Sequence, residues 1–267
     1  MAIHHDTWVF IFALLGNVIS FMVFLAPVPT FYQIYKKKST EEFHPLPYIV
    51  ALFSSMLWIY YALVKNNATL PLITINSFGC VIETIYLVIF LVYATKKIRL
   101  STIKILLLLD VFGFGGMLLS TLYLTKGSKR LAVIGWICLV VNISVFASPL
   151  SAVKRVITTK SVEFMPFGLS FCLTLNAIMW FFYGLLLKDY YVALPNTLGF
   201  LFGIIQMVLY LIYRKPKTVK LEEPMKLQEL NGHVIDVVKP STRDVEEPNG
   251  KEIEKGNVNN MDNVTNV

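Results

Sequence analysis

The hydrophobic residues of this 267-residue chain gather into long stretches instead of alternating with polar residues. A helix needs roughly 20 apolar residues to cross the ~30 Å hydrocarbon core of a bilayer, and seven stretches approach that length. The predicted spans are 8–28, 46–64, 70–93, 102–123, 132–152, 166–187 and 191–213. From about residue 214 the chain is polar, charged and almost free of aromatic residues, which indicates a disordered tail. The pattern predicts an all-α membrane protein with seven transmembrane helices.

Comparing the chain with itself shows that part of this pattern occurs twice. The matching segments are "VFLAPVPTFYQIYKKKSTEEF" with "VFASPLSAVKRVITTKSVEF", "SSMLWIYYAL" with "NAIMWFFYGL", and "INSFG" with "PNTLG". The offset is 122 residues in the first two spans of each copy and 120 in the third. Spans 1–3 and 5–7 are therefore interpreted as two copies of one three-helix unit.

Because three is odd, a directly fused second copy would be inverted in the membrane, and span 4 restores its direction. The result is a 3+1+3 arrangement, in which two parallel three-helix repeats are joined by a linker helix and related by an axis along the membrane normal. Transporters use this architecture. The predicted parts are a first repeat (1–93), the linker helix with its flanks (94–127), a second repeat (128–213) and a cytosolic tail (214–267).

Composition and charge refine the topology. The mean hydropathy is +0.62 and only 15% of the residues are charged, against roughly a quarter in soluble domains. On one predicted side there are 14 lysines and arginines: Lys36, Lys37, Lys38, Lys96, Lys97, Arg99, Lys104, Lys154, Arg155, Lys160, Arg214, Lys215, Lys217 and Lys220. The other side has five, Lys65, Lys126, Lys129, Arg130 and Lys188. Positive loops stay in the cytoplasm, so the N-terminus is predicted outside and the C-terminus inside.

The net charge of +7 thus reflects membrane topology, and no nucleic-acid partner is expected. Cys80, Cys138 and Cys172 all fall within hydrophobic segments, where they are interpreted as packing residues. The four histidines are scattered along the chain. We therefore expect no enzyme activity, no metal site and no cofactor.

Four segments resemble the plant SWEET sugar facilitators, also called the MtN3/saliva family. They are "GNVISFMVFLAPVPTFYQIYKKKST", "TKSVEFMPF", "MWFFYGLL" and "PNTLGFLFGIIQMVLYLIY", and the resemblance extends over about residues 8–215. It implies a low-affinity, bidirectional sugar uniporter of the plasma membrane that works by alternating access. The sucrose-transporting branch is the most similar, with glucose or fructose as co-substrates. The resemblance also implies contact with membrane lipid, homo-oligomers, and hetero-oligomers with related carriers.

Two residue pairs are candidates for sugar binding. Trp58 and Trp180 are equivalent in the repeat and lie too deep for an interfacial aromatic belt. The resemblance implies that their rings sandwich the sugar. Asn76 and Asn196 are also equivalent, and an amide both donates and accepts hydrogen bonds, as sugar hydroxyls do. The alternative for the asparagines is a structural clamp between helices, whereas the resemblance implies sugar binding.

By resemblance, further residues line the same cavity: Ser20, Val23, Ser54, Asn142, Val145 and Asn176. Ser54 and Asn176 each lie four residues before a tryptophan of the pair, hence on the same helix face. Asn176 occupies a position where many sucrose carriers have serine. This departure leaves sucrose and hexose preference open, with sucrose favoured.

The resemblance also implies two gates. The inner gate consists of four prolines near the cytoplasmic helix ends, Pro27, Pro47, Pro149 and Pro166. A proline inside a helix kinks it, whereas a proline at a helix start only marks where the helix begins. For Pro47 and Pro166, near predicted helix starts, both interpretations stay open. The outer gate consists of Tyr61 and Asp189, with Lys65 as a charged partner by position.

Two other functions are alternatives to sugar uniport. A proton-coupled transporter of the PQ-loop type would use an intramembrane carboxylate, and Glu83 and Asp110 are available. Glu83 is replaced by Gly203 in the second repeat, however, and the kinks lack Pro-Gln. A seven-helix receptor would have the same topology, but it would not be expected to contain a three-helix duplication. Uniport is the simplest mechanism.

Overall fold

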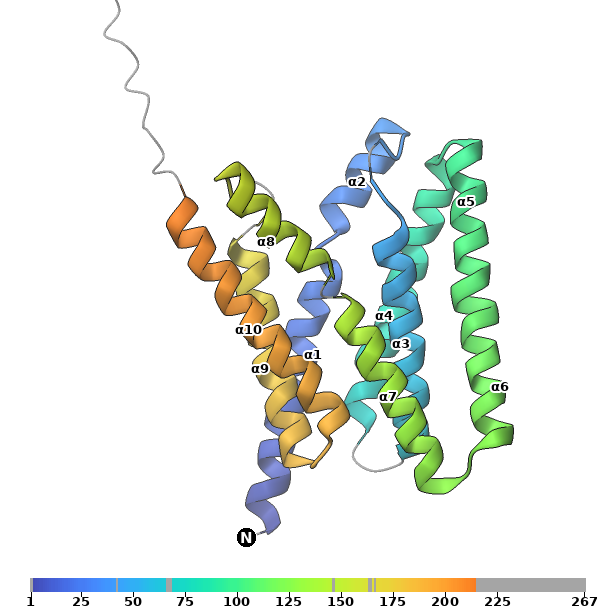
Figure 1. Cartoon of the computed structure of the whole chain (residues 1–267), viewed down its shortest axis with the longest axis vertical. Coiled ribbons are helices and arrows are strands. Elements are labelled where there is room, and N and C mark those ends of the chain that lie inside the picture. Colours follow the sequence, from blue (N-terminus) through green and yellow to red (C-terminus); the bar gives the residue numbers. More distant parts are fainter. Residues whose placement is uncertain are drawn as a thin grey trace, which may run out of the picture. The chain divides into compact units, whose positions relative to one another are not determined.

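The computed structural model describes residues 2–41, 43–65, 69–145, 147–162, 165 and 167–214, and every regular element within them is helical (Figure 1). The elements are α1 (Ala2–Leu25), α2 (Val28–Lys37), α3 (Leu46–Lys65), α4 (Leu70–Tyr93), α5 (Lys96–Leu106), η1 (Leu107–Gly113), α6 (Phe114–Leu124), α7 (Gly127–Val145), α8 (Ala147–Thr159), α9 (Phe167–Leu186) and α10 (Tyr190–Tyr213). Seven helical stretches are long and apolar enough to cross a membrane. The predicted fold class is confirmed. The predicted tail, apart from Arg214, lies outside the described residues.

Four of the predicted spans, the second, third, sixth and seventh, end within one residue of α3, α4, α9 and α10. The other three were predicted too short. Helical structure extends from Lys96 through Leu124, for example, where the prediction began at 102. Lys36, Lys37 and the basic residues from Lys96 to Lys104 therefore lie in helices and not in loops. Bilayer thickness limits only the apolar part of a helix, and lysine and arginine are good helix formers.

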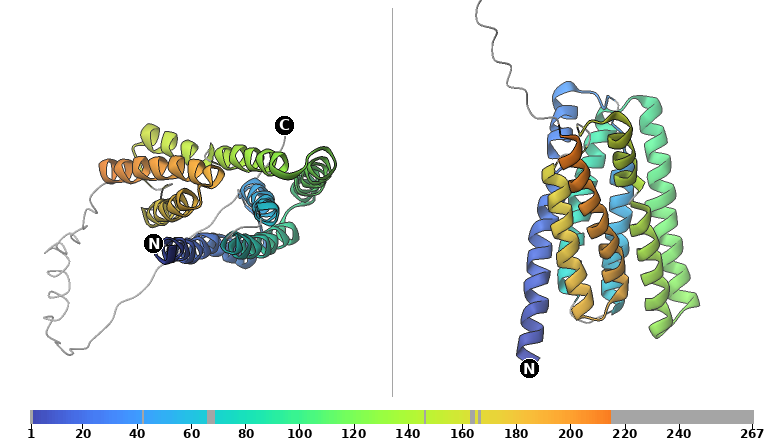
Figure 2. Two further views of the ribbon diagram at one scale, coloured as in Figure 1. Left: turned by 90° about the horizontal axis from the view of Figure 1, so that it is seen from below. Right: turned by 60° about the vertical axis from the view of Figure 1, so that its left-hand side comes forward.

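Each three-helix unit is built around its third helix. In the first unit, α4 packs against both α1 and α3, and in the second, α10 packs against both α7 and α9. The units meet where α1 contacts α9 and where α3 contacts α7. Because α1 corresponds to α7 and α3 to α9, these two contacts are equivalent to each other. The view along the helices shows this arrangement, with the linker helix on one side (Figure 2).

The linker comprises α5, η1 and α6, and it packs mainly on α3 of the first unit. Tyr60 of α3 shares a buried hydrogen bond of 2.8 Å with Thr121 of α6. At the far end of α6, the Arg130 guanidinium donates to the carbonyl oxygens of Thr121, Leu122 and Thr125. These carbonyls lie at a helix C-terminus, where they have no partner within the helix. The linker is thereby fixed to the first unit and capped by the second.

Candidate functional site

A chain of hydrogen bonds crosses the contact between α1 and α9. The Ser20 hydroxyl donates to Oδ1 of Asn176 at 2.6 Å, and the indole N–H of Trp180 donates to Oγ of Ser20 at 3.0 Å. Ser20 belongs to the first unit, and Asn176 and Trp180 belong to the second. The structure thus brings together three of the residues that the sequence predicted to lie in one site.

Trp180 lies against the backbone of α1 because residue 16 is glycine. A Cβ atom at Gly16 would come within 3.2 Å of Cε2 of the Trp180 ring, closer than most carbon contacts in proteins. Gly16 is not among the site residues predicted from the sequence. The repeat gave no signal there, because the equivalent residue of the second unit, 122 positions on, is Cys138.

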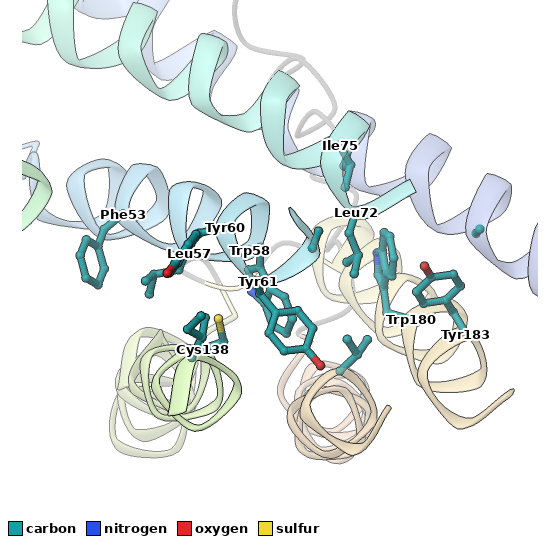
Figure 3. Close-up of a cluster of buried hydrophobic side chains, with 14 of the residues drawn as sticks. Phe53, Leu57, Trp58, Tyr60, Tyr61, Leu72, Ile75, Cys138, Trp180 and Tyr183 are labelled. Carbon is teal, nitrogen blue, oxygen red and sulfur yellow. The ribbon is translucent and has the colours of Figure 1, made fainter. Parts of the chain in front are cut away.

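The two tryptophans have the same local geometry in both units. The ring of Trp58 packs edge-on against Tyr61 with centroids 5.5 Å apart and planes at 83°. Trp180 packs against Tyr183 at 5.2 Å and 85°. Both belong to one buried cluster (Figure 3), with 8% and 7% of their surface exposed. No direct ring contact between Trp58 and Trp180 is present among the described residues, so each indole is held by residues other than its counterpart.

The amide pair is also symmetric. Nδ2 of Asn76 donates to the carbonyl oxygen of Leu72 at 2.8 Å, and Nδ2 of Asn196 donates to that of Val192 at 2.7 Å. Both side chains are half-buried. Within the described part of the chain, these bonds stay inside one helix, which disfavours the clamp between helices. One N–H and the carbonyl oxygen of each amide remain for another partner.

The remaining predicted lining residues show where the symmetry breaks. Asn142 and Ser54 are the repeat equivalents of Ser20 and Asn176, and both are half-buried. Among the described residues neither side chain has a hydrogen bond, and the indole N–H of Trp58 also lacks one. Val23 is half-buried near the end of α1, whereas Val145, the last residue of α7, is exposed. The polar groups are therefore bonded at the α1–α9 contact and unbonded at the α3–α7 contact.

At the end of the bundle opposite α2 and α8, hereafter the outer end, Tyr61 and Asp189 connect the two units. The Tyr61 hydroxyl lies 2.9 and 3.0 Å from the two carboxylate oxygens of Asp189. Lys65 forms an ion pair with the same carboxylate, whose side chain is only 1% exposed. Lys65 and Tyr61 come from α3, and Asp189 comes from the turn between α9 and α10. Charge-assisted bonds of this kind are stronger than neutral ones, so the outer end is closed by a buried polar contact.

The sequence of the α9–α10 turn allows Asp189 to reach the end of the bundle. Asp189 caps α10 by accepting a hydrogen bond from the backbone N–H of Val192 at 3.3 Å. Lys188 has a left-handed backbone with φ of 53°. A Cβ atom at Gly184 would lie 2.8 Å from the backbone nitrogen of Ala193. Only glycine allows the two helices to approach this closely, which places Asp189 over the end of the bundle.

At the opposite, inner end, the first helix of the first unit is broken near Pro27. Pro27 has no N–H, and α1 ends at Leu25 while α2 begins at Val28. The Phe24 carbonyl oxygen next to this break accepts a hydrogen bond of 2.9 Å from the Tyr86 hydroxyl. In the second unit α7 ends at Val145 and α8 begins at Ala147, two residues before Pro149, and residue 146 between them lies outside the described residues.

Of the other two prolines, one lies within the described residues. Pro47 is the second residue of α3, so it marks a helix start and not a bend. Pro166 lies outside the described residues. The inner segments, α2 and α8, pack on their own units, α2 on α4 and α8 on α7 and α10. They point apart in Figure 1.

Two carboxyl groups lie within membrane-spanning helices, and both are buried. Glu83 and Asp110 are 4% and 7% exposed. In the described structure, Oε2 of Glu83 and both carboxyl oxygens of Asp110 have no hydrogen-bond partner. An unpaired buried carboxylate is costly, and the neutral acid costs less. Asp110 lies in the π-helical segment η1, a local geometry that often marks functional positions.

Comparison with known proteins agrees with this architecture. The family model described as "Sugar efflux transporter for intercellular exchange" (MtN3_slv) matches residues 10–98 and again 132–218. Each match covers most of one three-helix unit, and most of the linker helix lies between them. The repeat that self-comparison found is thus also the repeat that the family model recognises.

Individual relatives are similar to this chain over most of its length. Bidirectional sugar transporter SWEET10 of Arabidopsis thaliana is 54% identical over 91% of this chain and 84% of its own length. SWEET13 of Oryza sativa subsp. japonica is 62% identical over 77% and 69%, and N3 of Medicago truncatula is 56% identical over 88% of each. The solved structure of a eukaryotic SWEET transporter superposes with a TM-score of 0.75 at 37% identity, covering 78% of this chain and 98% of that one.

These relatives are transporters and not enzymes, so the predicted absence of enzyme activity is confirmed. The resemblance inferred from the sequence motifs extends over both repeats. The chain therefore belongs to the MtN3/saliva family, the SWEET sugar transporters.

Proposed function

We propose that this protein is a facilitative, bidirectional sugar carrier of the plasma membrane, with its N-terminus outside. The observation that carries the proposal is the presence of the same tryptophan and asparagine at equivalent positions of two units. Such paired groups can hold a sugar between two halves that rock about it. The closed outer end and the separated inner segments support an inward-facing state of this cycle.

The mechanism that we propose is uniport. When Tyr61 and Asp189 separate and the inner ends approach each other, the central site would become accessible from the outside instead. Net flux then follows the sugar gradient. Affinity should be modest, because a carrier that works in both directions must release its substrate readily on each side.

We favour sucrose as the substrate, with glucose or fructose as co-substrates. Asn176 is larger than the serine of many sucrose carriers, but its amide is bonded to Ser20 on α1. This bond supports a position against the wall of the site, which leaves room for a disaccharide. The valines at positions 23 and 145 are moderate in size and are compatible with the same substrate.

Transport assays would test this function. Cells that lack other sugar carriers would be loaded with, or exposed to, labelled sucrose and labelled glucose, with and without a protonophore. We expect sucrose flux in both directions that is insensitive to the protonophore. If neither sugar moves although the protein reaches the membrane, the proposal is wrong.

Replacing Ser20 with alanine should weaken sugar binding. The change removes the two hydrogen bonds that hold the Trp180 indole and the Asn176 amide, each worth about 1 kcal/mol, so we expect sugar affinity to fall about fivefold to thirtyfold. Isothermal titration of the purified protein would measure it. Ser77→Ala, on the exposed face of α4, is the matched control. An unchanged dissociation constant for Ser20→Ala would show that the hydrogen-bonded chain does not organise the site.

Proton coupling is the second candidate, because Oε2 of Glu83 is buried without a partner in the described structure. The repeat argues against it. Gly203 is the equivalent residue, and a Cβ atom there would collide with the Thr174 side chain, so no side chain fits at that position. A symmetric pathway would thus have a carboxyl group in one half only. This favours a structural role for Glu83 between α3 and α4.

We expect Glu83→Gln to leave sugar flux within about twofold of the wild type, because glutamine resembles the neutral acid in shape and polarity. Flux would be measured at outside pH values from 5 to 8, with and without a protonophore. If the wild type accumulates sugar against its gradient and Glu83→Gln abolishes this accumulation, proton coupling replaces uniport as the mechanism.

The apolar surface of the helices indicates what the protein contacts in the membrane. Large apolar side chains on the outer faces of the helices are exposed, Phe10, Leu108, Phe112 and Leu124 among them. We propose that they contact membrane lipid, and that part of this surface serves association with further copies or with related carriers. Crosslinking in membranes followed by electrophoresis would measure the association.

A further inference from the structure

Two lysines occupy equivalent and unusual positions at the inner end. Lys38 follows the last residue of α2, and Lys160 follows the last residue of α8. Both have left-handed backbones, with φ of 55° and 53°. This conformation is unfavourable for a residue with a Cβ atom, and helices commonly end with glycine there. Lys188 has the same backbone conformation, with φ of 53°, so Lys38 and Lys160 are distinguished by the contacts of their side chains.

Both side chains reach the end of the third helix of their own unit. Nζ of Lys38 donates to the Tyr93 hydroxyl at 3.2 Å and lies 5.0 Å from the centre of the Tyr93 ring. Nζ of Lys160 donates to the Tyr213 hydroxyl at 3.0 Å and lies 4.8 Å from that ring centre. Tyr93 and Tyr213 are the last residues of α4 and α10. The lysines are 122 residues apart and the tyrosines 120, as in the rest of the repeat.

These two lysine–tyrosine pairs, hereafter the inner clamps, each link an inner segment, α2 or α8, to the third helix of its unit. The helix break after Leu25 separates α2 from α1, and α8 follows α7 across residue 146, which lies outside the described residues. In the first unit, buried Phe31 and Ile34 hold α2 to the hydrophobic cluster of α4. At the far end of α2, Tyr35 packs edge-on against Tyr93 with ring centres 6.1 Å apart, and Lys38 reaches the same tyrosine while lying 3.8 Å from the centre of the Tyr35 ring. Cation–ring attraction and a hydrogen bond act together at that point.

We propose that Lys38 and Lys160 are positioning residues that make each inner segment, α2 or α8, move as one body with the third helix of its unit. This rests on the proposed alternating-access function. Movement of α4 or α10 is then transmitted to α2 or α8, so that the inner end opens and closes with the rest of the unit. The clamps are exposed and individually weak, so they act on the rate of the cycle and not on folding.

The first test separates turnover from binding. Lys38→Met and Lys160→Met are each expected to lower the maximal flux about fivefold, with the dissociation constant for sugar unchanged within about twofold. Lys36→Met on α2 and Lys154→Met on α8 remove a neighbouring exposed lysine and should transport normally. Lys38→Arg should restore flux, because arginine also donates to the hydroxyl and stacks on the ring. A Lys38→Met, Lys160→Met double variant with wild-type flux would overturn the proposal.

The second test does not depend on transport. Spin labels at exposed Gln33 of α2 and Val92 of α4 would report the distance between these helices, in a chain whose three cysteines have been replaced. Lys38→Met should broaden the distance distribution, whereas Lys36→Met should not. An unchanged distribution overturns the coupling. If the wild type moves no sugar, the proposed function fails, and the distance measurement alone then decides on the clamps.

Discussion

Replacing Asn196 with alanine is expected to lower sugar flux about tenfold, because leaving a buried sugar hydroxyl without its partner costs ~1–3 kcal/mol of binding free energy. The fold should persist, since the only described bond of this amide is to Val192 in its own helix. Asn76→Ala should behave alike, because Asn76 makes the equivalent bond to Leu72. Uptake of labelled sucrose, normalised to the amount of protein at the membrane, would measure both variants.

The neighbouring residue provides the control. Thr197 also bonds a carbonyl one turn back in α10, that of Ala193 at 3.1 Å, but it is not among the predicted site residues. Thr197→Ala should therefore transport like the wild type. Equal flux in Asn196→Ala and Thr197→Ala would refute the assignment of the asparagine pair to sugar binding.

Replacing Asp189 with alanine is expected to abolish transport by preventing closure of the outer end. The change removes the cap of α10 and leaves Lys65 and the Tyr61 hydroxyl without their partner. Breaking a buried ion pair costs ~3–5 kcal/mol, which would lower the population of the outward-closed state more than a hundredfold. A cysteine introduced at Ser54, in a chain whose own cysteines have been replaced, should then react with an impermeant thiol reagent applied from outside.

Two further variants serve as comparisons for Asp189→Ala. Asp189→Asn keeps an acceptor for Tyr61 and for the helix cap but loses the charge, so flux should fall between the wild type and Asp189→Ala. Lys188→Gln changes an exposed neighbouring charge and should have little effect. If Asp189→Ala transports normally and the cysteine at position 54 stays protected, the contact at the outer end is not a gate.

The sequence predicted those features that the bilayer and the duplication impose. Span limits such as 70–93 coincide with α4 because hydrocarbon thickness determines them. The tryptophan and asparagine pairs were found because each residue type recurs at a constant offset. In the structure both pairs also have matching local geometry.

Other features depend on contacts between units, which a repeat does not encode. The bond from Ser20 to Asn176 joins side chains of different size from positions that are not equivalent, so no symmetry argument could find it. The fit of Trp180 against Gly16 likewise depends on how closely α1 approaches α9. The inner clamps follow the repeat, but only coordinates show that a lysine after one helix reaches a tyrosine at the end of another.

The unequal bonding of the two halves bears on how a disaccharide lies during passage. Sucrose has two different rings, and a perfectly symmetric site would accept it equally well in either direction. Here Trp180 and Asn176 are engaged with Ser20, whereas Trp58 retains its N–H for a ligand. For sucrose, the substrate that we propose, such a difference would distinguish the glucosyl end from the fructosyl end. Each molecule would then cross the membrane with one fixed ring leading on entry and the other leading on exit.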